Sequence, residues 1–100
     1  MGNILDDSGH KLAAIGEDGA VHNLQGGKLG QVMANGEVLN SSGDKVGSFG
    51  PNGYVYNREG SHVGTVHNDG RVYDYENHWI GSVSGGDFEP GGAALLLLAR

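Results

Sequence analysis

The sequence contains no cysteine among its 100 residues. A disulfide framework, a thiolate zinc site and a cysteine nucleophile are therefore excluded. Basic residues are also few, with six Lys and Arg against twelve Asp and Glu. The chain thus has no broad basic field to neutralise nucleic-acid phosphates or anionic membranes. We therefore expect a protein that binds no nucleic acid. The lack of cysteine fits a reducing compartment, so we also expect a cytoplasmic location.

The sequence has no apolar run that approaches the roughly 20 residues of a membrane-spanning helix. It begins without a basic segment followed by an apolar one, and Asp6 stands where a myristoylation signal needs Ser or Thr, so no targeting signal is expected. The apolar tail, residues 93–100, contains the four leucines Leu95 to Leu98. Because such a run in water promotes association, we expect the tail to pack on an open face of the repeat body or into a neighbouring subunit. Either a strand or a short helix would serve.

Most of the twenty glycines recur with a period of seventeen residues. Such a period predicts a repeat architecture rather than disorder. The expected organisation is a single β-repeat domain at 4–88, a linker at 89–92 and the apolar tail. Alignment without gaps divides the domain into five units at residues 4–20, 21–37, 38–54, 55–71 and 72–88.

Three positions of each unit predict a core residue and a turn. The first position is aliphatic in every unit, and the third is always Asp or Asn. The sixth position holds residues that readily adopt a positive backbone φ. We therefore expect structural turns at Gly9, Gly26, Gly43, Gly60 and Asn77.

Each unit is expected to form a β-hairpin. Its ninth and twelfth positions are apolar, and its tenth is Gly or, once, Ala13. Asn-Gly or Asp-Gly pairs follow in the first four units, and these pairs are a strong hairpin signal. Because positions nine and twelve are three residues apart, a regular strand cannot present both on one face. We therefore expect a bulge, with another backbone close to the small tenth residue.

Five hairpins in series could close around an axis or stack as a short β-solenoid. Closure removes the unpaired edge strands, and the units show no ladder of aromatic or Asn residues suited to solenoid stacking. We therefore favour an all-β fold in which five hairpins are arranged radially as a closed, flower-like ring. A short β-solenoid is the alternative.

The repeat resembles that of the bacterial five-fold β-flower proteins. The likeness shows in VLNSSGDKVGSFGPNG at 38–53 and VYNREGSHVGTVHNDG at 55–70, with VHNLQGGKLGQVMANG at 21–36 next. It covers residues 4–88 and implies a radial ring of five hairpins, but no activity. Ala13, Asn77 and the irregular end of the fifth unit at 84–88 depart from the pattern.

Histidines and carboxylates are the candidate metal ligands, and both have simpler interpretations. His10 and His78 share the seventh position of the first and last units, which closure would make neighbours, but no third ligand is specified. Calcium is disfavoured because Asn replaces Asp in the middle turns, and an Asp in an Asx turn needs no metal. With no nucleophile elbow or phosphate loop, we expect no catalytic residue, metal or cofactor, and no enzyme.

Aromatic residues concentrate in the second half of the chain, and four are candidate ligand-binding residues: Tyr56, Tyr73, Tyr75 and Trp79. Tyr56 and Tyr73 both follow the apolar first position of a unit and should face away from the core. Trp79 stands where the first three units have lysine. Such aromatics are favoured in interfaces and sugar-stacking platforms, but they also stabilise sheets by cross-strand packing.

Three functions therefore remain open. The leading hypothesis is a non-catalytic structural or protein-interaction module that self-associates, or binds another protein, through the aromatic side or the leucine tail. The alternative is a small-ligand or glycan-binding module that uses the aromatic-rich second half. An enzyme or metal site built on His10 and His78 is the least supported.

Overall fold

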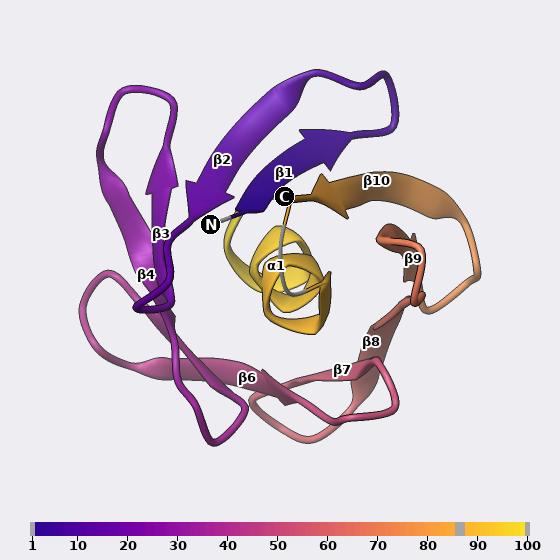
Figure 1. Cartoon of the computed structure of the whole chain (residues 1–100). Helices are drawn as coiled ribbons and strands as arrows, with labels where there is room; N and C mark the ends of the chain where they lie inside the picture. Colours follow the sequence, from indigo (N-terminus) through magenta and orange to yellow (C-terminus); the bar gives the residue numbers. More distant parts are fainter. Residues whose placement is uncertain (1, 86–87, 100) are drawn as a thin grey trace.

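The computed structural model describes residues 2–85 and 88–99. Ten antiparallel strands form one closed ring, in which consecutive strands pair and β1 pairs with β10 (Figure 1). The predicted closed ring is confirmed, and the solenoid alternative is wrong. The strands are β1 Gly2–Asp6, β2 Lys11–Ile15, β3 Ala20–Asn23, β4 Lys28–Val32, β5 Glu37–Asn40, β6 Lys45–Phe49, β7 Tyr54–Asn57, β8 His62–Val66, β9 Arg71–Asp74 and β10 Trp79–Ser84.

The first turn of every unit is organised by the side chain at its third position. In the fourth unit, Asn57 Oδ1 accepts hydrogen bonds from the backbone N–H of Glu59 and of Ser61, at 3.0 and 2.9 Å. The sixth position has a positive φ throughout, between 84° and 88° at the glycines and 68° at Asn77. This is the backbone conformation expected of that position. The same pair of side-chain bonds recurs at Asp6, Asn23, Asn40 and Asp74.

The expected bulge is present in all five hairpins, and the extra residue is the ninth of the unit. In the fourth hairpin, Val55 pairs with Gly64 and Tyr56 with His62, which leaves Val63 without a partner in the register. The other four hairpins slip at the same place. The tenth and twelfth positions are two residues apart and both face inward, while the bulged ninth residue is half-buried.

The core consists of rings of equivalent residues. The first position of each unit is fully buried in all five units. The twelfth position adds Ile15, Val32, Val66 and Val83, none more than 6% exposed, and the half-buried Phe49. Burial of these aliphatic groups is the main driving force for closing the ring. The first-position residues are Ile4, Val21, Val38, Val55 and Val72.

The C-terminal segment fills the centre of the ring (Figure 1). It consists of α1 Phe88–Ala94 and a π-helical turn, η1 Leu95–Ala99. The expected linker at 89–92 is wrong, because these residues belong to α1. The expected apolar tail packs as a helix in the centre of its own ring, with Leu95 only 1% exposed, while Arg100 lies outside the described residues.

Successive leucines of η1 meet successive units of the ring. Five equal units are about 72° apart around the axis, whereas an α-helix turns by about 100° per residue. A π-helix turns less per residue, which suits one leucine per unit. At the tenth position another backbone lies close, as expected: an added Cβ at Gly81, Gly64, Gly47 or Gly30 would first meet a carbonyl oxygen of the neighbouring strand. Glycine there also makes room for a leucine, since the added Cβ would lie 2.9 Å from Leu95 at Gly81, 2.6 Å from Leu96 at Gly64, 2.6 Å from Leu97 at Gly47 and 2.7 Å from Leu98 at Gly30.

The fifth unit ends differently from the others, as expected. Gly85 has a positive φ of 79°, and the chain enters α1 at Phe88. Gly86 and Asp87, which belong to the predicted irregular end, lie outside the described residues. Within the part of the chain that the structure describes, no helix is long and apolar enough to cross a membrane.

Candidate functional site

A row of side chains crosses four strands on the outer face of the ring. Tyr54 of β7 pairs with Thr65 of β8, Thr65 with Tyr73 of β9, and Tyr73 with Trp79 of β10. Directly paired residues project to the same face of a sheet. Val72, next to Tyr73, is fully buried, so the row faces outward.

Two histidines join this row. The ring centroid of His62 lies 5.2 Å from that of Tyr54 and 6.1 Å from that of Tyr56, and His62 Nε2 is 3.2 Å from Thr65 Oγ1. His67 packs against Tyr73 with a centroid distance of 4.4 Å. The histidines therefore limit the rotamers of the tyrosines beside them. Together with Arg71, these residues form a surface that we term the aromatic face: Tyr54, Tyr56, His62, Thr65, His67, Arg71, Tyr73 and Trp79.

Trp79 is anchored at one edge and exposed elsewhere. Its indole Nε1 donates a hydrogen bond to the carbonyl oxygen of Gly81 at 2.7 Å. The guanidinium carbon of Arg71 lies 6.0 Å from the Trp79 ring centroid, at the limit of a cation–π contact. Because 47% of Trp79 remains exposed, the residue presents a fixed aromatic surface to solvent.

Three of the four sequence-predicted ligand-binding residues lie on the aromatic face. They are Tyr56, Tyr73 and Trp79. Tyr75 follows β9, is 68% exposed, and is not among the described ring contacts of this face. The other residues of this face were not predicted from the sequence: Tyr54, His62, Thr65, His67 and Arg71. The bulged register was the signal that could have found His62, because it pairs the eighth position of a unit with the second.

The equivalent outer surface of the first three units has a different chemistry. There the eighth position is lysine, paired with Leu5, His22 and Leu39 in turn. Lys45 forms an ion pair with Glu37, with Nζ and Oε2 3.4 Å apart. The aromatic face is therefore a property of the fourth and fifth units, together with Tyr54 at the end of the third, and not of the repeat.

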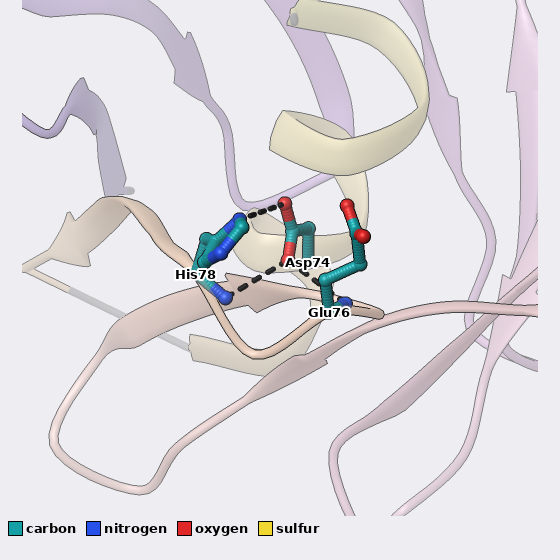
Figure 2. A group of neighbouring side chains, drawn as sticks. All are labelled: Asp74, Glu76 and His78. Atoms are coloured by element: carbon teal, nitrogen blue, oxygen red, sulfur yellow. Dashed lines mark hydrogen bonds and ion pairs between the residues drawn. The ribbon is translucent and has the colours of Figure 1, made fainter.

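Asp74, Glu76 and His78 form a cluster of possible metal ligands at the β9–β10 turn (Figure 2). Their ligand atoms all lie within 4.8 Å of one another. Asp74 Oδ1 accepts the backbone N–H of Glu76 and of His78, at 3.0 and 2.9 Å, and its Oδ2 is 3.7 Å from His78 Nδ1. The turn alone thus accounts for the position of all three residues.

The first unit repeats this geometry without the second carboxylate. Asp6 accepts the backbone N–H of Ser8 and of His10, and its Oδ2 lies 3.7 Å from His10 Nδ1. The backbone N–H of His10 is the main cause that holds the pKa of Asp6 below its ordinary value. His10 and His78 are therefore each paired with the aspartate of their own turn. Within the described residues, the possible ligands grouped around His78 do not include His10.

The structure also explains the turn aspartates without calcium. Asp18 accepts the backbone N–H of Ala20, and Asp69 accepts that of Arg71, both at 3.0 Å. Asp6 and Asp74 do the same in the first turns, so all four aspartates act as Asx-turn acceptors. Asn performs the same role in the middle units, where no charge is needed.

The fold and its outer surface define a class of small closed β-repeat rings. A family description, 5-fold beta-flower protein, matches residues 1–94 of the chain. The protein therefore belongs to the five-fold β-flower family, and the resemblance seen in its repeats is confirmed. No curated protein and no solved structure matches the chain.

Proposed function

We propose that the protein is a non-catalytic interaction module that self-associates through the aromatic face. The observation that carries this proposal is the in-register row from Tyr54 to Trp79, whose two ends are 45% and 47% exposed. The leucine tail, the other expected contact, is packed against the core of its own ring. It therefore offers less to a second copy than the aromatic face does.

The chemistry of the aromatic face suits a protein contact. Tyr, Trp and Arg are enriched in the centres of interfaces, where they provide large contact areas. The contacts of Tyr73 with His67 and of Trp79 with Gly81 restrict both rings before a partner arrives. Less side-chain entropy is then lost on binding. The residues of this face are fewer than the roughly 20 to 30 per partner of a standard interface, so we expect weak, reversible association.

Sedimentation velocity on the full chain tests the proposal. The weight-average mass should rise between about 10 µM and 1 mM, the range in which a weak dimer forms. Trp79→Ala should weaken association at least about 30-fold, because truncating an interface anchor costs about 2 kcal/mol or more. Leu24→Ala is the matched control, since Leu24 is 58% exposed on another unit. A monomeric wild type over this range would sink the proposal.

A small-ligand or glycan-binding module is the second candidate. It is favoured by the anchored and exposed indole of Trp79, which is directly paired with Tyr73. Stacking on a sugar ring uses such fixed aromatic surfaces. Trp79 is the only tryptophan of the chain, so its fluorescence can be followed during titration with neutral disaccharides. Unchanged fluorescence throughout would remove this candidate.

We also propose a cytoplasmic location for the module. The support is compositional, since the chain contains no cysteine and a small secreted domain commonly depends on disulfides. Cell fractionation would check this, and recovery outside the cytoplasm would contradict it.

A further inference from the structure

A bowl opens at one end of the ring axis, on a surface different from the aromatic face. It lies between the start of α1 and the second turns of the first three units, and its volume is about 760 Å³. Pockets that bind small molecules commonly measure about 300 to 1,000 Å³. The bowl is therefore large enough for a small organic ligand.

The bowl exists because the C-terminal segment breaks the five-fold symmetry. The chain enters the centre from the fifth unit, so α1 covers the neighbouring sectors. Gly91 packs against Val83 and Gly92 against Val66, while Phe88 packs against Gly70. The corresponding space over the first three units is left open.

The apolar lining of the bowl comes from equivalent positions of those three units. Ile15, Val32 and Phe49 are the twelfth residues of the first, second and third units. Their counterparts in the last two units are the valines that α1 covers. Met33, which is 39% exposed, extends this apolar surface. A ligand with an apolar body would find here the contact that α1 supplies elsewhere.

The charged lining of the bowl has one sign. Glu17 and Asp18 come from the turn of the first unit, and Glu89 from the first turn of α1. The described lining residues include no Lys, Arg or His. Carboxylates beside apolar walls attract cations more strongly than the same groups in open water.

From this lining we infer that the bowl binds a small organic ammonium ion, with its apolar body on Ile15, Val32 and Phe49 and its charge toward Glu17 and Glu89. The apolar surface explains why a metal cation alone would be a poor occupant. The carboxylates explain why a neutral or anionic molecule of the same shape would bind less well. The inference does not depend on self-association, because it uses other residues.

A methyl NMR titration of the full chain tests the inference. Phenethylammonium is the probe, with 2-phenylethanol and 3-phenylpropanoate as its neutral and anionic counterparts. The ammonium ion should shift the methyl signals of Ile15, Val32 and Met33 saturably, with a dissociation constant of about 1 mM for nine heavy atoms. Its affinity should exceed that of the alcohol roughly threefold or more and should fall with added salt.

Charge variants separate this site from general attraction to an acidic protein. The double variant Glu17→Gln and Glu89→Gln should weaken ammonium binding roughly three- to tenfold. Glu59→Gln is the control, because Glu59 is a turn carboxylate outside the bowl lining; its affinity should match that of wild type. Backbone amide spectra verify that each variant is folded. Equal affinities for ammonium ion and alcohol, an unchanged double variant, or no saturable methyl shift would each overturn the inference.

Discussion

At the residue scale, one side-chain oxygen organises each first turn. In every unit it accepts the backbone N–H groups two and four residues later, as Asn57 does from Glu59 and Ser61. Asp and Asn supply the same oxygen, which explains why the third position changes between them without a change of turn. Only aspartate makes the turn depend on pH.

Asp6 therefore makes a pH-dependent contribution to stability. Its pKa is lowered in the folded state, mainly by the backbone N–H of His10. A lowered carboxyl pKa stabilises the fold above the unfolded pKa, and this contribution is lost as pH falls through the folded pKa. The Asp6→Asn variant keeps the acceptor oxygen but cannot titrate. We expect it to be somewhat less stable in urea than wild type at pH 7, because it lacks the charge, and to lose less stability than wild type below about pH 4.

The measurement is the urea midpoint of both proteins at neutral and acidic pH. Asp18→Asn serves as the matched control, because Asp18 is also an Asx-turn acceptor but is exposed in a second turn. If wild type and Asp6→Asn lost the same stability between pH 7 and about pH 2.5, Asp6 would contribute nothing to acid sensitivity.

At the element scale, large side chains of η1 lie opposite small residues of the ring. Leu95 to Leu98 meet glycines of the fifth, fourth, third and second units in turn. The next residue, Ala99, then corresponds to the first unit, where Ala13 stands in place of glycine. Four units thus place a glycine of the ring against a leucine of η1. In the first unit the corresponding residues are both alanine, and Ala13 is fully buried.

This correspondence predicts coupling between Ala13 and Ala99. Ala99→Leu should destabilise the fold by about 1 to 3 kcal/mol through overpacking. Ala13→Gly should also destabilise it, by about 0.5 to 1 kcal/mol or more, because glycine has greater freedom in the unfolded chain. The double variant should be more stable than the sum of the two effects predicts. Chemical denaturation in a double-mutant cycle measures this coupling, and strictly additive losses would contradict it.

The sequence of α1 predicted a linker where the structure has a helix. Pro90, Gly91 and Gly92 are poor helix formers in isolation, and together they resemble a linker. Pro90 is the third residue of α1, where its missing N–H leaves no hydrogen bond broken. Gly91 and Gly92 are needed because an added Cβ would collide with Val83 and Val66. Tertiary packing therefore overrides local propensity, and only the assembled ring reveals that packing.

At the scale of the whole molecule, the repeat explains the closed ring. Departures from the repeat explain the aromatic face and the bowl. The seventeen-residue period predicted five hairpins, and the removal of unpaired edge strands favoured their closure over a solenoid. Tyr56, Tyr73 and Trp79 could be chosen because they depart from the other units. Tyr54 and His67 could not, since their neighbours depend on pairing between adjacent units. The bowl could not be predicted from the sequence either, because it arises from the path of α1 into the centre of the ring.

The chain closes into a ring whose centre is filled by its own tail, and the proposed binding surfaces are therefore the aromatic face and the bowl. Nuclear Overhauser contacts from leucine methyl groups to glycine α-protons test this claim most directly. A filled ring predicts intramolecular contacts in strict succession, with Leu95 to Gly81, Leu96 to Gly64, Leu97 to Gly47 and Leu98 to Gly30. Leucine methyl groups that contact only another molecule, or a single unit of the ring, would contradict it.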